Sequence, residues 1–451
     1  MFSFLKDALG GVYFVGIGGV SMSALAQILH DHAIKVRGCD ARESEFTRKL
    51  RALGIPVVIG TEEIEQDVVV YTEAVDRHAA MLERAAQAGK RLYSRAEFLG
   101  KLAEEYPHVL SVAGCHGKTS ATAMLAHVLF CARLSCTCHI GGEDTAFGNY
   151  KSTGGEYFVT EACEFKRSFL ALRSEIAVIL NTDLDHTDCY KSREELLETY
   201  RRFAEQARLV VVNADDNEAQ KIPHALSFGL YAGDVRAERL CPDQERYSFM
   251  ISERGMHVVR VSLQTVGKIQ IYNALAAYCA ARLCGISPRA IADGLEEFRG
   301  VRRRFERAGT LRGVPVIFDY AHHPTEIAAA LATAEGTCRG TVRVIFQPHT
   351  YTRTRDLMGE FVRVLRRAEN PIIYRTYAAR EDFDFNGSAV ALVSRVPEAI
   401  YCQSPEDLYR RISLLVQPDD LILVLGAGDI DGIVRAMLDQ TSTGTPFCSQ
   451  A

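Results

Sequence analysis

The chain has 451 residues, of which 47% are hydrophobic and 24% are charged, and this composition excludes wholesale disorder. Its 52 basic and 57 acidic residues give a net charge of −5, which offers no bulk electrostatic case for binding nucleic acid or an anionic membrane. A chain of this length exceeds one compact core, so we expect two or three domains.

The length of the apolar runs and the number of cysteines indicate the cellular compartment that we expect. The longest apolar runs, such as Ile176–Leu180 and Leu421–Leu425, are far shorter than the roughly 20 residues that a membrane helix requires. The N-terminal segment shows no basic stretch ahead of an apolar one, so we expect no secretion signal. The 13 cysteines then indicate free thiols in a reducing compartment. We therefore expect a cytoplasmic protein without a membrane span.

The first predicted unit alternates strands with helices. A strand at 11–15 leads through a glycine turn into a helix at 20–30 and then a strand at 35–39. Further strand–helix units run to Tyr93, and residues 94–105 are expected to form a helix. This alternation is typical of a parallel sheet with helices on both faces.

Two further units start after Pro107 and after residue 300. The second is expected to contain strands at 109–113, 157–160, 176–180 and 209–212, a long helix from Lys118, short strands within 236–263, and an alanine-rich helix starting near Tyr272. The third is expected to contain strands at 314–318, 342–346, 371–374 and 421–425, with a polar, loose tail from Thr441. We therefore predict three consecutive α/β domains at 1–104, 105–300 and 301–451.

The first glycine turn resembles a dinucleotide-binding fingerprint. It is written Gly16-Ile17-Gly18-Gly19-Val20-Ser21, and Asp40 follows at about the expected distance. Glycines at a helix N-terminus let the backbone approach a diphosphate. Because Ser21 stands where the third glycine is expected, a diphosphate-bearing nucleotide other than a nicotinamide is favoured. A tight turn without a ligand is the alternative.

The second glycine turn has the context of a phosphate-binding loop. The run Gly114-Cys115-His116-Gly117-Lys118-Thr119 follows a predicted strand and opens a helix. Its backbone N–H groups would surround phosphates, the lysine would reach the terminal ones, and the threonine hydroxyl would bind Mg²⁺. Position 112 is valine, where the full motif has glycine. We expect Lys118 to lie exposed in this loop, so that its removal would alter turnover and not folding.

Other polar residues also follow predicted strands, where ligands bind in open α/β sheets. Glu161 and the run Asn181–His186 could complete a divalent metal site beside the phosphate loop, although Asp183 and Asp185 could instead cap a helix. The cluster Arg302–Arg304 is either a solvated linker or a contact to phosphates or carboxylates. Cys131, Cys136, Cys138 and His139 match no zinc pattern well, and neither do the paired histidines of Asp319–Pro324.

At this point the motifs identify a family. In chain order they are GIGGVSMSALA, GCHGKTSAT, TEACEFKRSFL, NTDLDHTD, RRRFE, DYAHHPTE, FQPHTYTRTRD and GAGDI. Together they resemble the Mur ligases of bacterial cell-wall synthesis, and most of all the members that join L-alanine to UDP-N-acetylmuramate. The resemblance covers nearly the whole chain. It implies Rossmann-like first and last domains around a P-loop ATPase-like central domain.

The resemblance also implies roles for particular residues. Those that would face the UDP diphosphate are Gly16, Ile17, Gly18, Gly19 and Ser21, with Asp40 nearby. Those that would bind ATP are Gly114, Cys115, His116, Gly117, Lys118, Thr119, Ser120, Asn273, Arg304 and Asp319. Magnesium would be held by Thr119, Glu161 and His186, and the residues that act on the reacting groups would be Lys118, His186 and Arg353.

Two departures from the family pattern affect these roles. Many relatives have His-Asn where this chain has Ile269-Gln270, which leaves the adenine contact to Asn273. Many also have arginine where Thr350 stands, which makes Arg353 the better candidate for a substrate clamp.

The implied reaction transfers the γ-phosphoryl group of ATP to a carboxylate, giving an acyl phosphate that the alanine amine then attacks. Such chemistry needs positioning and cations rather than a covalent enzyme group. The alternatives are a sister ligase that adds a peptide or another amino acid, a nicotinamide-dependent oxidoreductase, and a non-catalytic nucleotide switch. The oligomeric state and the strictness for L-alanine over serine or glycine stay open.

Overall fold

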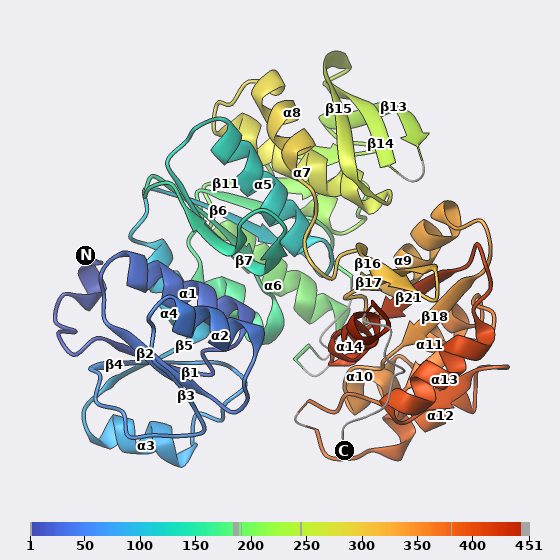
Figure 1. Ribbon diagram of the computed structural model, residues 1–451. Coiled ribbons are helices and arrows are strands. Elements are labelled where there is room, and N and C mark those ends of the chain that lie inside the picture. The colour runs from blue at the N-terminus through green and yellow to red at the C-terminus, as the bar shows by residue number, and fades with distance from the viewer. Residues whose placement is uncertain (1, 184–188, 191, 244–245, 380, 443–451) are drawn as a thin grey trace.

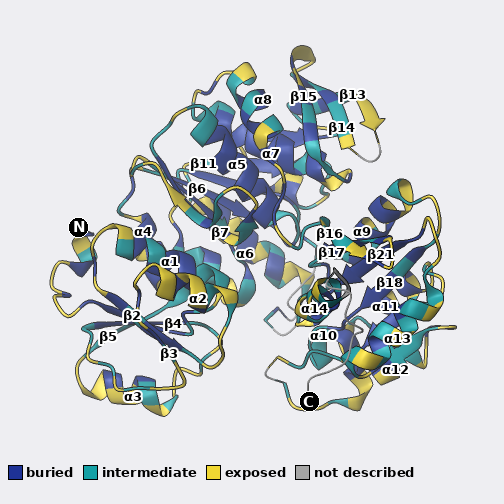
Figure 2. Cartoon of the chain, in the orientation of Figure 1, coloured by how far each residue is buried: buried dark blue, intermediate teal, exposed yellow. Residues whose placement is uncertain are grey.

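The computed structural model describes residues 2–183, 189–190, 192–243, 246–379 and 381–442. Three β-sheets follow one another along the chain, each forming the centre of a separate lobe with helices packed on it (Figure 1). The strands are mostly buried, and exposed residues concentrate on helix surfaces and loops (Figure 2). This arrangement confirms the predicted fold class of three consecutive α/β domains. The boundaries at 104 and 300 stay a prediction.

The N-terminal sheet has five parallel strands in the order β3-β2-β1-β4-β5. Its elements are η1 (Ser3–Leu5), β1 (Val12–Val15), α1 (Val20–Asp31), β2 (Val36–Asp40), α2 (Glu45–Ala52), β3 (Val57–Ile59), β4 (Val68–Tyr71), α3 (Ala80–Gln87), β5 (Arg91–Ser94) and α4 (Arg95–Ala103). The chain reverses its direction of travel across the sheet at β1, so the crevice beyond β1 is where such a sheet binds ligands. The first glycine turn lies there.

The central sheet has ten strands in the order β15-β14-β13-β12-β11-β10-β6-β9-β7-β8. Its elements are β6 (His108–Ala113), α5 (Lys118–Cys131), β7 (Cys136–Asp144), β8 (Gly148–Ser152), β9 (Tyr157–Ala162), η2 (Phe165–Ala171), β10 (Ile176–Ile179), α6 (Arg193–Glu205), β11 (Leu209–Asn213), η3 (Ala219–Lys221), β12 (Leu226–Gly229), β13 (Val235–Asp243), β14 (Arg246–Glu253), β15 (Met256–Val266), α7 (Ile269–Leu283) and α8 (Pro288–Glu297). Strands β6, β9, β10 and β11 run parallel, so their carboxyl ends share one edge.

The C-terminal sheet has six strands in the order β16-β17-β21-β18-β19-β20. Its elements are β16 (Glu306–Leu311), β17 (Val314–Asp319), α9 (Pro324–Thr337), β18 (Val342–Phe346), α10 (Tyr351–Asp356), α11 (Met358–Leu365), β19 (Ile372–Tyr374), η4 (Phe385–Gly387), α12 (Ala389–Val393), β20 (Ile400–Cys402), α13 (Pro405–Leu415), β21 (Leu421–Leu425) and α14 (Ile430–Ser442). Residues 443–451, most of the tail expected to be loose, lie outside the described residues.

The expected parallel arrangement does not extend to every strand of the central and C-terminal sheets. Strands β7 and β8 form an antiparallel pair, as do β13 with β14, β14 with β15, and β16 with β17. Each of these pairs is joined by a short connection, and only antiparallel strands can be joined so closely. The parallel centre of each sheet, which carries the candidate site, follows the prediction.

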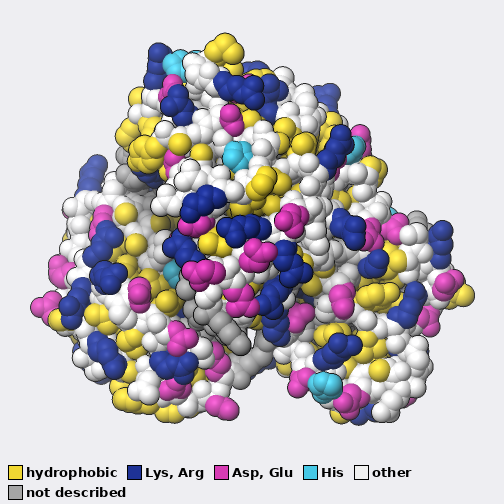
Figure 3. Space-filling view, turned by 180° about the vertical axis from the view of Figure 1, so that it is seen from behind, with side chains coloured by type: hydrophobic (Ala, Val, Ile, Leu, Met, Phe, Trp, Pro, Cys, Tyr) yellow, Lys and Arg dark blue, Asp and Glu magenta, His cyan; other side chains and the backbone are white. Residues whose placement is uncertain are grey.

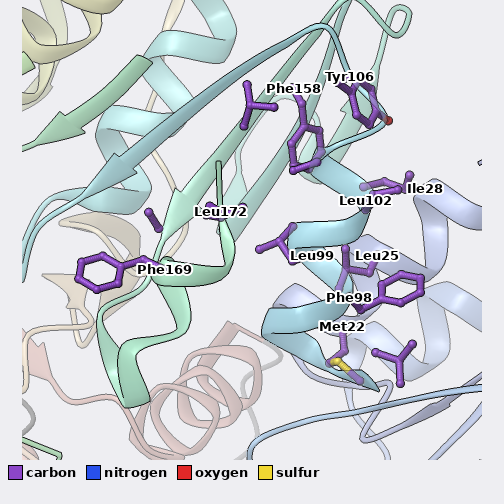
Figure 4. Close-up of a cluster of buried hydrophobic side chains, with 14 of the residues drawn as sticks. Met22, Leu25, Ile28, Phe98, Leu99, Leu102, Tyr106, Phe158, Phe169 and Leu172 are labelled. Carbon is purple, nitrogen blue, oxygen red and sulfur yellow. The ribbon is translucent and has the colours of Figure 1, made fainter. Parts of the chain in front are cut away.

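A continuous apolar core joins the N-terminal and central domains. Met22 and Leu25 on α1 belong to the same buried cluster as Phe98 on α4, Phe158 on β9 and Phe169 on η2 (Figure 4). Because these side chains come from both domains and are fully buried, separating the domains would expose a large apolar surface to water.

Within the part of the chain that the structure describes, no helix is both long and apolar enough to cross a bilayer. Every cysteine among the described residues is a free thiol.

Candidate active site

The second glycine turn connects β6 to α5 and has the backbone shape of a phosphate loop. Gly114 and Gly117 adopt φ values of 140° and 85°, which side chains with a Cβ rarely tolerate. A Cβ at Gly117 would lie 2.5 Å from Asn273 Oδ1, so the loop also packs closely against α7. On the opposite side, the His116 N–H donates to Asn181 Oδ1 at 2.9 Å. The parallel strands β6 and β10 thus bring their following residues into contact, as predicted.

Lys118 is buried and paired, not exposed as expected from the sequence. Its Nζ lies 2.9 Å from Glu164 Oε2 and 3.2 Å from the Cys115 carbonyl oxygen, and it also donates to the Gly114 carbonyl. Burial opposes the charge, but Glu164 raises the pKa of Lys118 above its usual range, so the ammonium is charged. Since the Glu164 side chain is only 1% exposed, the two charges form a buried ion pair beside the loop.

His116 links the loop to the C-terminal domain. Its Nδ1 lies 3.1 Å from Glu326 Oε1 at the start of α9, and its Nε2 lies 3.4 Å from Asp183 Oδ2. Burial alone would lower the pKa of His116, but these two carboxylates raise it to about 9. The imidazolium is therefore held between an acid of its own domain and an acid of the next one. Asp183 thus faces His116, whereas Asp185 and the other residues of 184–188 lie outside the described residues, so the alternative of helix capping stays open.

Glu326 receives several donors at once. Its Oε2 accepts the His322 N–H at 3.0 Å and lies 3.3 Å from His322 Nδ1, in addition to the contact with His116. Burial would raise the pKa of Glu326, but His322, His116 and Arg304 lower it well below its usual range. Glu326 is thus an anion that both domains share.

A pocket between the central and C-terminal domains contains most of the predicted nucleotide contacts. Of the residues carried over for ATP, it is lined by His116, Gly117, Ser120, Asn273, Arg304 and Asp319. Ile269 and Gln270, the two positions that depart from the family pattern, line it as well. Asn273 Nδ2 donates to Gln270 Oε1 at 3.1 Å, so these two amides act as one polar group on the pocket wall.

Asp319 and Arg304 form the part of this pocket that the C-terminal domain and its linker supply. Asp319 accepts the Phe305 and Ala321 N–H groups at 2.8 Å each, and burial raises the pKa of its carboxyl to about 6 although Arg304 opposes the shift. Arg304 Nη2 lies 3.5 Å from Thr119 Oγ1. The linker arginine therefore reaches the phosphate loop directly.

The three metal-ligand candidates are described only in part. Thr119 is buried at the start of α5, and Glu161 Oε1 on β9 accepts the Gly141 N–H at 2.6 Å. A Cβ at Gly142 would lie 2.7 Å from Thr119 Cγ2, so both candidates border the same stretch of strand β7. His186 lies outside the described residues. Among the residues that the structure describes, no three His, Cys, Asp or Glu side chains gather as a metal group.

Arg353 is not among the residues that line the nucleotide pocket. It is on α10, its Nη1 is 3.4 Å from His349 Nδ1, and the His349 ring is 5.8 Å from that of His322. Thr350, the position where relatives carry arginine, adopts φ 67° just before α10. Arg353 does not line the nucleotide pocket and so stays a candidate for the substrate side of the site.

The first glycine turn is closed by contacts within the N-terminal domain. Gly16 and Ile17 donate their N–H groups to the Cys39 carbonyl at 2.8 and 3.0 Å, and Gly18 donates to Asp40 Oδ2 at 2.8 Å. Gly19 ends the turn as the N-cap of α1, whose first N–H groups have no helical partner. The Asp40 carboxylate thus already accepts a hydrogen bond from one N–H of the loop, as a bound anion would.

Ser21 makes a contact between domains. Its Oγ lies 2.9 Å from His139 Nε2 on β7, and His139 Nδ1 lies 2.9 Å from Thr160 Oγ1. Burial, together with the positive charge of Arg95, lowers the pKa of His139 to about 4, so the ring is neutral. His139 is therefore a contact between the N-terminal and central domains. The role of Ser21 toward a diphosphate stays a prediction.

The three arginines of the cluster before β16 make different contacts. Arg302 Nη1 lies 3.0 Å from Glu45 on α2 and 3.6 Å from Glu143, and Lys49 pairs with both of these acids. Arg303 donates to the carbonyl oxygens of Gly426 and Gly428. The middle of the molecule, viewed from behind, carries side chains of both charges (Figure 3). Only Arg304 of this cluster reaches the nucleotide pocket.

Sequence reasoning missed Glu164 and Glu326 as site residues. Both stand inside motifs that the sequence displays, TEACE and DYAHHPTE. Glu326 falls at the third position of α9 and completes a capping box with His323, so its local pattern is that of an ordinary helix start. Only the approach of His116 from another domain distinguishes it.

Family models match each domain of the chain. They are the Mur ligase family catalytic domain over residues 11–107, the Mur ligase middle domain over 112–281 and the Mur ligase glutamate ligase domain over 303–428. A protein named UDP-N-acetylmuramate–L-alanine ligase from Clostridium perfringens is 35% identical over 446 residues, which cover 95% of this chain and 98% of that protein. The chain belongs to the Mur ligase family.

Solved structures of Mur ligases agree with this membership. A UDP-N-acetylmuramate–alanine ligase from Thermotoga maritima is 28% identical, covers 96% of this chain and 100% of its own, and superposes with a TM-score of 0.84. A MurF ligase from Thermotoga maritima, solved in complex with ADP, is 16% identical, covers 90% of this chain and 94% of its own, and has a TM-score of 0.60. The second likeness shows the fold alone.

Proposed function

We propose that this Mur ligase is the enzyme that joins L-alanine to the carboxyl group of UDP-N-acetylmuramate, with ATP as the source of energy. The observation that carries the proposal is the relative of this name at 35% identity over 95% of the chain. The phosphate loop facing a pocket between two domains supports a nucleotide-driven reaction. We further propose that the reaction takes place in the bacterial cytoplasm, where ATP and nucleotide sugars are made.

The proposed role of the phosphate loop is to hold the ATP phosphates. Lys118 would exchange its contacts with the loop carbonyls and Glu164 for the terminal phosphates, and the loop N–H groups would bind the others. Thr119, Glu161 and His186 are the proposed Mg²⁺ ligands, a hydroxyl, a carboxylate and an imidazole. Magnesium, when bound, would neutralise charge on the phosphates. Asn273, with Gln270, would contact the adenine.

The proposed chemistry has two steps. The γ-phosphoryl group moves from ATP to the substrate carboxylate, which leaves ADP and an acyl phosphate. The alanine amine then attacks the acyl carbon, and the C–N bond forms as phosphate departs and the amine loses a proton. Arg304, charged and within 3.5 Å of Thr119, is positioned to stabilise negative charge as it develops near the loop. Arg353 is proposed to hold a carboxylate on the far side.

The N-terminal domain is proposed to hold the UDP part. The turn that follows β1 would present the first N–H groups of α1 to a diphosphate, once Asp40 yields the Gly18 N–H. A uridine ligand should therefore raise the melting temperature, whereas NADH should not. Stabilisation by NADH alone would favour the oxidoreductase alternative.

One assay tests the activity. ADP release with Mg²⁺ should require both UDP-N-acetylmuramate and an added amine, and L-alanine should be the best of a panel of single amino acids. Preference for a preformed peptide would favour the sister-ligase alternative. ATP binding without amine-dependent ADP release would favour a nucleotide switch and contradict the proposal.

A further inference from the structure

A second cavity adjoins the nucleotide pocket. Its volume is about 490 Å³, room for many water molecules, each of which takes about 30 Å³ in the liquid. It shares Val266, Arg304 and Phe305 with the nucleotide pocket, so these residues form the wall between the two. None of the residues carried over from the family for UDP or for L-alanine lines it.

The lining of this cavity is strongly basic. Four arginines line it against two acids, Asp243 and Glu306, and the arginines are Arg246, Arg299, Arg304 and Arg307. Glu306 is already engaged, because Arg435 Nη2 lies 2.7 Å from its Oε2 and the Arg303 N–H donates to the same oxygen at 2.8 Å. The formal net charge of the lining residues is +2. Because the charge of Glu306 is already compensated by Arg435, the electrostatic potential inside the cavity is more positive than this sum suggests.

None of the four guanidiniums that line this cavity has a close anionic partner among the described residues. Among the described residues, no carboxylate lies within 4.0 Å of Arg246, Arg299 or Arg307. Arg302 in the same linker is, by contrast, paired with Glu45. Guanidiniums gathered without acids are the usual recognition group for phosphate, because each presents a planar fork of N–H donors. Thr145, Gln264 and Thr265 add neutral hydrogen-bonding groups.

The cavity spans the connection between two domains. Arg246 begins β14 of the central domain, Arg299 stands in the linker, and Arg307 lies on β16 of the C-terminal domain. The linker itself contains three residues at positive φ, Gly300 at 113°, Arg303 at 60° and Phe305 at 49°. An anion held by all three arginines would therefore tie the central domain to the C-terminal domain across this bent segment.

We propose that this cavity binds a small phosphate-class anion, either free inorganic phosphate or a phosphate group of a nucleotide, and that the bound anion bridges the central and C-terminal domains. The proposal concerns binding and does not depend on the ligase activity. It rests on the convergence of unpaired guanidiniums from three segments on one cavity.

The test is calorimetric titration of the full chain with inorganic phosphate at fixed ionic strength, with and without saturating AMP-PNP and Mg²⁺ to fill the nucleotide pocket. Arg299→Gln and Arg307→Gln are expected to weaken binding about tenfold each, the usual loss for one charged hydrogen-bonding partner. Arg260→Gln is the matched control, because Arg260 is exposed on β15 and does not line the cavity. All three arginines are exposed, so these variants should melt like the parent protein.

The outcomes separate the two sources of the anion. Phosphate binding that persists under AMP-PNP identifies inorganic phosphate as the ligand. Binding of a second AMP-PNP, displaced by phosphate and weakened in the Arg299→Gln/Arg307→Gln double variant, identifies a nucleotide phosphate. Absence of phosphate binding, or binding that the double variant leaves unchanged, overturns the proposal. Because no turnover is measured, failure of the ligase assay leaves this result standing.

Discussion

Lys118 combines a position in the packing beneath the phosphate loop with its proposed role toward the ATP phosphates. It is 14% exposed, and its nearest charged partner, Glu164, is buried. A buried ion pair contributes little by itself, but removal of one partner leaves the other charge without compensation. The lysine of a phosphate loop is therefore here also part of the packing beneath the loop.

Lys118→Ala is expected to lower kcat by roughly 10²–10³, the usual scale for loss of one preorganised contact to developing charge. It should also destabilise the protein by about 3–5 kcal/mol, because Glu164 would remain buried without its cation. Kinetics and urea unfolding measure the two effects. The Lys118→Ala/Glu164→Gln double variant should regain stability and not turnover. If it regained both, Lys118 would have no role in the reaction.

The position of His116 between two acids makes stability depend on pH. The pKa of His116 is raised in the folded protein from about 6.5 to about 9, so its stabilisation is complete below pH 6.5 and is lost as the pH rises through 9. Glu326→Gln should remove about 1–3 kcal/mol at pH 6 and flatten this loss. Unfolding free energies measured from pH 6 to 9.5 test this pH dependence. Glu83→Gln is the control, because Glu83 pairs with the exposed His78. Equal pH profiles for parent and Glu326→Gln would contradict it.

At the scale of elements, close packing outweighs helix propensity. Helix α8 lies against α5, and a Cβ added at Gly294 would lie 2.5 Å from the Val128 Cα. The two helices therefore approach more closely than a side chain at this position would allow. A glycine in the middle of a helix is otherwise unfavourable by about 0.5–1 kcal/mol relative to alanine.

The same substitution should have opposite effects in two helices. Gly294→Ala is expected to destabilise the protein by about 1–3 kcal/mol, because α8 must move away from α5. Gly432→Ala on α14 should stabilise it by about 0.5–1 kcal/mol, since no atom lies within 4 Å of the added Cβ. Thermal unfolding of the two variants measures the difference. Stabilisation by both would show that α5 and α8 are not tightly packed.

At the scale of the whole molecule, the domains are joined in two different ways. The N-terminal and central domains share an apolar core, with Phe98 and Phe158 in one cluster (Figure 4). The C-terminal domain is joined mainly by polar contacts, such as His116 to Glu326 and Arg304 to Thr119. Polar contacts can be exchanged for contacts with a ligand at small cost, whereas an apolar core cannot. We therefore expect the C-terminal domain to be the one that moves.

Arg302→Ser tests the link that spans the N-terminal domain and the linker. Exposed ion pairs contribute little free energy, so the unfolding free energy should change by less than about 1 kcal/mol. The distribution of distances between fluorescent labels on the N-terminal and C-terminal domains should broaden. Arg201→Ser is the control, because Arg201 pairs within α6 with Glu198. Identical distributions for both variants would mean that Arg302 does not restrain the domains.

The sequence by itself determined the local features of this protein. The strand and helix sequence, the two glycine turns and the presence of polar residues after β6, β10 and β17 follow from short-range patterns, because hydrophobic period and glycine conformation act over a few residues. The family motifs added the roles expected of those residues. The structure places Asn273, Arg304 and Asp319 around one pocket with the loop, although they are far apart in the chain.

Only the tertiary structure decided the partners of the charged residues. The sequence pattern predicts an exposed loop lysine at Lys118, but the structure pairs it with the buried Glu164. The local pattern at Glu326 is that of a helix cap, but His116 from another domain contacts it. The antiparallel edge strand β16 and the arginine-lined cavity beside it likewise depend on how the domains meet. Ion pairs and burial are set by distances between residues remote in the chain, and no local pattern encodes those distances.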